Sequence, residues 1–418
     1  MGNAQSNAGT DTDTDTLDQV LPDFIDTMLS CKGAAARAAA ARRVQVLCDV
    51  GQKQNRVPMV CSGKYDVLTP LAKCLNGSGE ECNHALLVLN NLSIPEENKR
   101  VMALGPSSKD IIGGLCKTIA KNTEETYLCC ICLMNISFLE ACRKPILWHS
   151  PGPNGSESNI PPLENPGSLL RVIEKLLLAN SPTKPAATET VRWACGLLKN
   201  LAKSEENAAL IGRTEIPECI VDFVRASTTC ASRWANNSIE DFSLFVVLNL
   251  SEWPGSSRDA LRRAGATGVI EPIVAAAEGG GPCNNTIQGL KAAMISAFLD
   301  DGTYRYGSSI GGEAAEKAVA ELVANLRTGR GKEGQYAYGV FNLHTAMKAY
   351  DIIMPPTNVA GREATDALVS QLLRDKHARE LQDLQDKHES ELKRNNLGPG
   401  NVEGNGVREP LLSRRIFS

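Results

Sequence analysis

Aromatic residues, long apolar runs and an excess of basic charge are all scarce in this sequence. Phe, Trp and Tyr make up 5% of the chain, and the formal net charge is -4 at pH 7. The most apolar run, residues 127–139, contains Asn135 and is shorter than the ~20 residues that span a bilayer as a helix. We therefore expect no transmembrane helix and no nucleic-acid-binding surface spread over the whole chain.

Signatures of catalysis and of secretion are also missing. The sequence contains no phosphate-binding glycine loop, no nucleophile elbow and no paired acid–base motif. Its 14 cysteines occur without a secretory signal peptide, and many stand within apolar phrases, which is typical of reduced, buried thiols in a cytoplasmic protein. We predict no enzyme activity, no small-molecule substrate and no cofactor.

One cysteine cluster has the residue types of a metal site. Cys129 and Cys132 form a Cys-x-x-Cys pair with Cys130 between them, and such a pair is half of a zinc site. No second Cys-x-x-Cys and no His pair at ligand spacing follow it. We interpret the three thiols as buried structural residues and predict no metal site; an enzyme that uses this cluster is the alternative.

A recurring phrase, with an asparagine near the end of an apolar segment, is what the sequence does contain. The steps between successive asparagines are 44 residues (91 to 135), 65 (135 to 200), 49 (200 to 249) and 93 (249 to 342). The last step is about two repeats long and has a degenerate copy at 292–297 at its midpoint, and residues 47–51 are a plausible first copy. A period of ~40 to 47 residues is typical of two- or three-helix repeats stacked into a solenoid.

Each copy has the same internal order. The asparagine phrase is followed by a short acidic turn, such as residues 95–98 or 204–207, then by a short helix that reaches a glycine, and then by a second apolar helix. Few aromatics and many Ala and Leu residues fit closely packed helices without strands. The pattern predicts an all-α chain.

Two segments carry a resemblance to a known family. Residues 265–274, GATGVIEPIV, together with Leu-Asn-Leu-Ser at 248–251, resemble the armadillo repeat found in β-catenin, importin-α and membrane-anchored vacuolar armadillo proteins. The resemblance covers roughly residues 20–350 and is strongest at 80–140 and 190–275. It implies a right-handed α-solenoid of about seven armadillo-like repeats, and HEAT-type repeats are the near alternative.

The resemblance also implies a role for the repeated asparagines. In armadillo proteins the third helix of each repeat lines a concave groove, where the Asn amide bonds the backbone of an extended peptide through its donor and its acceptor. By motif match, the peptide-binding residues here are Asn91, Asn135, Asn200, Asn249 and Asn342. The alternative is that each asparagine only caps the end of its helix.

Importin-like members place a tryptophan one turn before that asparagine, as a cage for basic cargo. The residues at this position here are Leu87, Ile131, Gly196, Phe245 and Tyr338. Binding of nuclear signals is therefore not expected. We interpret Trp193, Trp234 and Trp253 as packing residues.

The N-terminus carries a lipidation pattern. In MGNAQS, Gly2 becomes the terminal residue after removal of Met1 and Ser6 occupies the favoured position for N-myristoylation. One myristoyl chain binds membranes only marginally, and the first 30 residues contain six aspartates and no Lys or Arg, so anionic lipid repels them. We predict reversible attachment to the cytosolic face of a membrane; an unmodified, disordered start is the alternative.

The predicted organisation has four parts. Residues 1–16 form a disordered acidic tail with the lipidation signal, residues 17–350 the solenoid with a Pro- and Gly-rich inserted loop at 149–167, residues 357–395 a charged helix and residues 396–418 a disordered tail. The charged helix has acid-before-base pairs four residues apart and only a thin leucine stripe, which leaves a solvated helix and a coiled coil both open.

These features together predict a non-enzymatic adaptor. Its groove would bind an extended or helical segment of a protein partner, and Gly2 would hold it at a cytosolic membrane face. The alternative is a soluble armadillo scaffold in cytoskeletal or transport machinery that has no lipid anchor.

Overall fold

The computed structural model describes residues 13–30, 33–77, 79–149, 161–180, 188–229, 239–278 and 291–300, the last without residues 293 and 297. All of them belong to one compact unit, Met1–Val319 with Val340–Pro355. Gly2, Asn342, the predicted helix at 357–395, the tail at 396–418 and most of the insertion at 149–167 lie outside the described residues. Within these residues every regular element is helical and no strand occurs.

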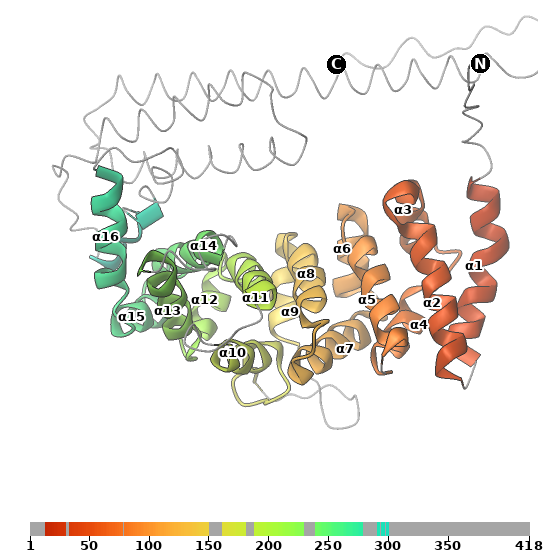
Figure 1. Ribbon diagram of the computed structural model, residues 1–418, viewed down its shortest axis with the longest axis horizontal. Helices are drawn as coiled ribbons and strands as arrows, with labels where there is room; N and C mark the ends of the chain where they lie inside the picture. The colour runs from red at the N-terminus through yellow and green to blue at the C-terminus, as the bar shows by residue number, and fades with distance from the viewer. Residues whose placement is uncertain are drawn as a thin grey trace, which may run out of the picture. The chain divides into compact units, whose positions relative to one another are not determined.

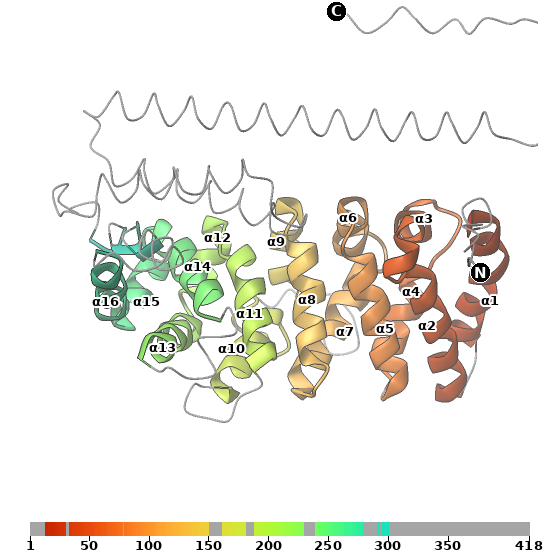
Figure 2. The same ribbon diagram turned by 45° about the horizontal axis from the view of Figure 1, so that its top comes forward.

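The helices that carry the asparagine phrases form one row with α2, which we call the third-helix row. Each member packs against the next, and Figure 2 shows the first four standing side by side. The row consists of α2 (Ala34–Cys48), α5 (Glu80–Leu92), α8 (Thr126–Ser137), α11 (Thr188–Leu201) and α14 (Ile239–Glu252). The repeated asparagine phrases are the C-terminal ends of α5, α8, α11 and α14.

Two further rows complete the stack (Figure 1). The second-helix row consists of α1 (Asp13–Ser30), α4 (Leu68–Leu75), α7 (Ser108–Lys121), α10 (Leu169–Ala179), α13 (Ile216–Thr229) and α16 (Ala266–Glu278). The first-helix row consists of α3 (Arg56–Cys61), α6 (Glu96–Leu104), α9 (Glu140–Leu147), α12 (Glu205–Ile211) and α15 (Ser256–Arg263). A 3-10 helix, η1 (Val50–Asn55), joins α2 to α3. Stacking by rows of a three-helix unit makes the described chain an α-solenoid, as the sequence predicted.

Packing on several sides explains why the third-row helix α8 is apolar nearly all round. In α8, Cys129, Cys130 and Cys132 are each 0% exposed, because α5, α7 and α11 surround the helix. Burial raises the pKa of Cys130 and of Cys132 to about 12. The cluster is thus part of the core, and no group of three metal-ligating side chains that could hold an ion occurs among the described residues.

The acidic segments after the asparagine phrases are helix starts, which corrects the expectation of turns. Glu96 and Glu97 form the first turn of α6, and Glu205 and Glu206 form that of α12. Carboxylates are favourable there because the helix N-terminus carries partial positive charge. Ser204 caps α12 by accepting a hydrogen bond from the backbone amide of Asn207.

Among the described residues, no helix combines the length and the apolar character that crossing a bilayer requires.

Candidate functional site

The repeated asparagines connect neighbouring repeats. Asn135 Nδ2 on α8 donates to Ser93 Oγ, just beyond the end of α5, at 3.0 Å. Asn200 Nδ2 on α11 donates to Met134 O of α8 at 3.0 Å and to Ser137 Oγ at 3.3 Å. Each amide therefore reaches back to the C-terminal end of the preceding third-row helix. The sequence analysis did not name this role.

The same arrangement continues at both ends of the row. Asn249 Nδ2 donates to Lys199 O at 2.7 Å. The Asn91 amide faces the Cys48 thiol on α2 and lowers its pKa; burial has the larger effect and raises the pKa to about 12. Cys48 thus takes the place that Ser93 has in the next repeat. The first copy of the phrase is therefore centred on Val46, three residues before the position that the sequence suggested.

The serine hydroxyl of the phrase donates a hydrogen bond to a carbonyl of its own helix and accepts one from the asparagine amide of the next repeat. Ser93 Oγ donates to Asn90 O at 2.7 Å, and Ser137 Oγ donates to Met134 O at 2.9 Å. One hydroxyl can donate along its own chain and accept from the next repeat at once. The Asn-x-Ser phrase is therefore an inter-repeat connection.

Exposure differs along the row. Asn200 and Asn249 are 3% and 9% exposed, whereas Asn91 and Asn135 are half-buried. A partner can therefore touch the amides of the α5 and α8 phrases more readily than those of α11 and α14.

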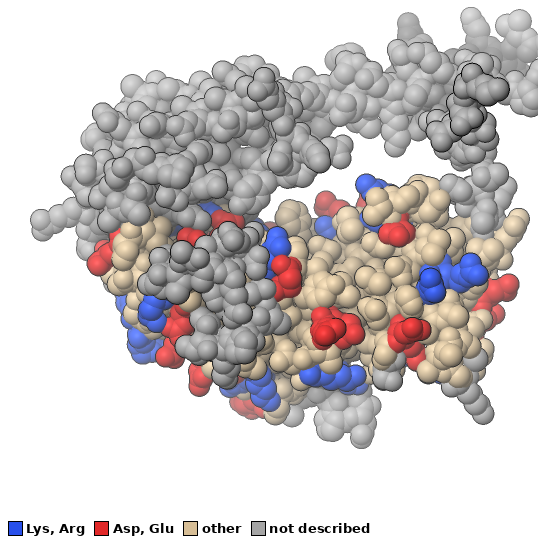
Figure 3. All heavy atoms as spheres, in the orientation of Figure 1, with Lys and Arg blue, Asp and Glu red and all other residues tan. Residues whose placement is uncertain are grey.

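Beside the half-buried amides lies a set of exposed apolar side chains, which we call the apolar strip. Val46 on α2 is 60% exposed, Ile94 just after α5 is 52% exposed and Phe138 just after α8 is 67% exposed. Half-buried Leu87 and Ile131 lie one turn before the asparagines of the same helices. In Figure 3 the surface over α5 and α8 is mostly uncharged, with acidic side chains along its lower edge. Lys99 Nζ lies 5.0 Å from the Phe138 ring centre. The three exposed side chains belong to the same end of three consecutive third-row helices, and exposed apolar surface gathered in one place marks a binding site more often than scattered single side chains do.

On α11 and α14, too, aromatic rings meet cations. The rings of Trp193 and Phe242 lie 6.1 Å apart, and Arg192 lies 4.7 Å from the Trp193 ring. Lys199 Nζ is 5.0 Å from the Phe242 ring centre. Burial, with the nearby Lys203 cation, lowers the pKa of Lys199 to about 8. The chain's own cations therefore occupy the ring faces.

Gly196 explains this packing. It holds the position where importin-like armadillo proteins have tryptophan, and a Cβ there would lie 2.8 Å from Met134 Sδ and 3.5 Å from a Phe242 ring carbon. The side chains of the neighbouring helices thus fill the space over Gly196. No open tryptophan cage for a basic peptide exists at this repeat.

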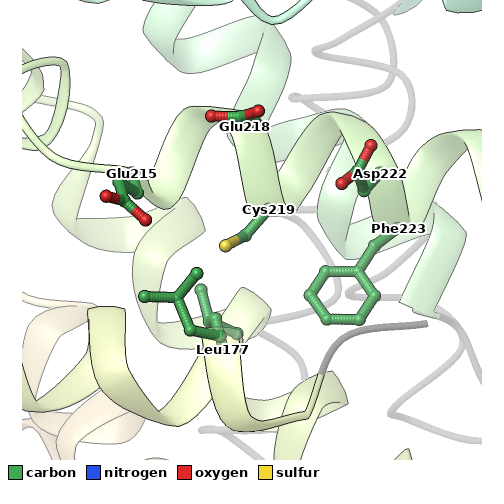
Figure 4. Close-up of a pocket in the computed structure, with 7 residues that line it drawn as sticks. Leu177, Glu215, Glu218, Cys219, Asp222 and Phe223 are labelled. Carbon is green, nitrogen blue, oxygen red and sulfur yellow. The ribbon is translucent and has the colours of Figure 1, made fainter. Parts of the chain in front are cut away.

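A hollow lies between the second-row helices α10 and α13. Figure 4 shows Cys219 of α13 directed into it, with Glu218 and Asp222 on the same helix and Glu215 just before its start. Its volume is about 190 Å³. Burial, with the surrounding carboxylates, raises the pKa of the Cys219 thiol to about 12, so this thiol is a poor nucleophile near neutral pH.

Comparisons with known proteins show the fold. A designed armadillo repeat protein is similar at a TM-score of 0.50 and 16% identity, over 67% of this chain and 99% of that chain. An engineered protein is similar at 0.50 and 17%, over 66% and 97%. A designed armadillo repeat protein in complex with the peptide (KR)4 is similar at 0.50 and 15%, over 66% and 99%.

The sequence itself matches no family model, and no curated protein resembles it at a significant level. The structural likeness establishes the class: the chain has an armadillo-like repeat fold, an α-solenoid of three-helix units.

Proposed function

We propose that the protein is a non-enzymatic interaction scaffold, and that it binds an extended segment of a partner protein along the third-helix row. The observation that carries the proposal is the apolar strip, which leaves Val46, Ile94 and Phe138 more than half exposed on three consecutive repeats. Support also comes from the armadillo-like fold, and one similar designed protein is in complex with a peptide.

Simple geometry sets the length of that segment. Packed helices lie ~8–10 Å apart, and an extended chain advances ~3.3 Å per residue. Each repeat therefore meets about two to three partner residues, and about six residues span α2 to α8. Apolar side chains of the segment would lie on the strip while its backbone meets the half-buried amides of Asn91 and Asn135. Asn200 and Asn249, predicted as peptide-binding residues too, mainly hold their repeats together.

The strip is tested with the double variant Ile94→Ser/Phe138→Ser. Twelve-residue peptides are first selected on the full-length protein from a random library, and their affinities are then measured by fluorescence anisotropy. Because each lost side chain removes ~1–2 kcal/mol of apolar burial, we expect affinity to fall at least tenfold. Circular dichroism should show unchanged helix content, since both side chains are exposed.

The matched control is Leu104→Ser, at the end of the first-row helix α6. Leu104 is 49% exposed, so the substitution removes a similar side chain from a different row. Peptide affinity should stay at the wild-type value. Equal affinities for the double variant and the control would remove the strip from the binding site. Asn200 and Asn249 are unsuitable for this test, because loss of a buried inter-repeat hydrogen bond costs ~1–3 kcal/mol of stability.

We further infer reversible membrane attachment through myristoylated Gly2, on the sequence pattern alone. The protein is produced with and without an N-myristoyltransferase, and its binding to neutral and anionic vesicles is measured by sedimentation. We expect only the acylated form to sediment, and more weakly as the anionic lipid content rises, because the first 30 residues carry six aspartates and no cation. The Gly2→Ala variant should remain in the supernatant. If wild type also remains there when acylated, the soluble-scaffold alternative replaces the anchor.

A further inference from the structure

A cleft of about 490 Å³ opens between α2 and α5, at the N-terminal end of the third-helix row. Its lining residues are Ala35, Ala38, Ala39, Arg42, Arg43, Val46, Glu80 and His84. We call it the α2–α5 cleft. Its volume falls within the range of ~300–1,000 Å³ that is typical of ligand pockets.

The cleft forms where α2 carries small alanine side chains. With Val46 of α2 in register with Asn91 of α5, Ala39 corresponds to His84, and the same position in α11 is Trp193. Alanine therefore stands on α2 where larger side chains stand on the later helices. The exposed Val46 forms one edge of the cleft and continues into the apolar strip.

Positively charged side chains outnumber negatively charged ones at the cleft. Arg42 and Arg43 line the α2 wall, both exposed, and no hydrogen bond or ion pair of either guanidinium is found within the described part of the chain. Glu80 is the one carboxylate among the lining residues, and His84 on the same wall lies 2.9 Å from Gln45 Oε1 through Nδ1. The cleft thus pairs an apolar floor with excess positive charge at its rim.

We propose that the α2–α5 cleft is the anchor site for the partner segment, and that it accepts a bulky apolar side chain directly beside an acidic residue. The proposal rests on the function proposed above and adds the chemistry of the partner. The alanines and Val46 contact the apolar side chain, and Arg42 or Arg43 forms a charge-assisted pair with the neighbouring carboxylate, for which the planar guanidinium is well suited. A basic neighbour would meet two like charges.

Palindromic peptides test the chemistry without knowledge of the binding direction. The first probe is Ile-Ser-Ile-Ser-Glu-Phe-Glu-Ser-Ile-Ser-Ile with a fluorescent label. Three others replace the centre by Gln-Phe-Gln, Lys-Phe-Lys or Glu-Ala-Glu. On the full-length protein we expect the Glu-Phe-Glu peptide to bind about tenfold more tightly than the Lys-Phe-Lys and Glu-Ala-Glu peptides. The Gln-Phe-Gln peptide should fall between them.

Variants of the cleft separate its two contributions. Ala39→Trp should fill the cleft and abolish the advantage of Phe over Ala at the peptide centre, while Arg42→Gln/Arg43→Gln should abolish the advantage of Glu over Lys. Ala120→Trp, at an exposed position of the second-row helix α7, is the matched control and should leave all four affinities unchanged. The substituted positions on α2 are exposed, and circular dichroism confirms the fold of each variant.

The outcomes distinguish this proposal from the peptide-binding function on which it rests. Equal affinities for the four peptides, or a preference for lysine, would overturn the anchor chemistry and leave peptide binding by the row intact. A Glu-Phe-Glu preference that survives in the Ala39→Trp and double-arginine variants would place the preference elsewhere and overturn the cleft. Failure of all four peptides and of every library peptide to bind would overturn both proposals.

Discussion

Between about pH 9 and pH 10.5 the protein is expected to lose its helical structure cooperatively. Burial raises the pKa of seven thiols from 9.0 to about 12: Cys48, Cys74, Cys116, Cys130, Cys132, Cys195 and Cys219. In the unfolded chain these thiols ionise near their ordinary pKa, whereas in the folded chain they remain protonated. The stability they contribute is therefore fully present below pH 9 and is lost as the pH rises toward 12.

The expected effect is large because many thiols act together. Each thiol loses ~1.4 kcal/mol of stabilisation per pH unit above its unfolded pKa, so seven thiols lose ~10 kcal/mol at pH 10. That is comparable with the whole stability of an ordinary domain, ~5–15 kcal/mol. Lys199 acts in the opposite direction, since its pKa of about 8 makes folding more favourable as the pH rises from 8 toward 10.5. Lys199 alone offsets ~3 kcal/mol at most. Burial also lowers the pKa of Lys99 and of Lys291, which act in the same direction, but the seven thiols outnumber these three lysines.

Circular dichroism and ultraviolet absorbance, measured on the same samples, check this expectation. The loss of the far-UV circular dichroism signal and the appearance of thiolate absorbance should coincide in pH. The variant Cys130→Ala/Cys195→Ala should reduce the slope of the unfolding free energy against pH by ~3 kcal/mol per unit. Cys61→Ala, at an exposed thiol whose pKa burial also raises, should reduce the slope less than either buried thiol does. A protein that keeps its helix content above pH 11 would contradict the argument.

Gly212→Ala is expected to lower the free energy of unfolding by ~3 kcal/mol. Gly212 ends α12, and a Cβ there would lie 2.5 Å from both Cα and N of Ser257 and 2.7 Å from the carbonyl carbon of Ser256. All three atoms belong to the backbone at the start of α15, so the contact is relieved only if two first-row helices separate. The change is measured as a shift of the urea-unfolding midpoint by circular dichroism.

Gly268→Ala is the matched control and should have the opposite sign. Gly268 lies inside α16, and a Cβ there would have no other atom within 4 Å. Alanine loses less backbone entropy than glycine in a helix, so stability should rise by ~0.5–1 kcal/mol. Two variants with the same midpoint shift would show that close packing at Gly212 does not limit how α12 and α15 approach.

The pattern of apolar residues within each segment is enough to predict much of the fold. The positions of the third-row helices follow from the apolar phrases around Asn91, Asn135, Asn200 and Asn249, because helix formation and amphipathicity depend on residues within three or four positions of one another. The prediction of turns at the acidic segments is wrong, and the reason is local as well. Glu96–Glu97 and Glu205–Glu206 read as polar turns, although acids are typical of a first helical turn.

Other contacts have a sequence signal that becomes visible only with the structure in view. An arginine six to eight residues after the end of a third-row helix donates from Nε to a carbonyl at that end, where the helix carries partial negative charge. The three pairs are Arg56 with Cys48 O at 2.8 Å, Arg143 with Ser137 O at 3.2 Å and Arg258 with Ser251 O at 3.0 Å. The spacing alone did not separate these arginines from others on the surface.

By itself, the sequence determined that the described chain is helical, that its helices recur in units and that the asparagine stands near the end of one apolar helix in each unit. Only the tertiary structure decided what those groups face. Asn200 meets Met134 and Ser137, and Arg42 stands over an alanine-floored cleft beside α5. The physical reason is that a repeat buries its surface against residues some forty to sixty positions away. The spacing of the repeats predicts that such contacts form, but the pairing of atoms depends on how closely each helix approaches its neighbour.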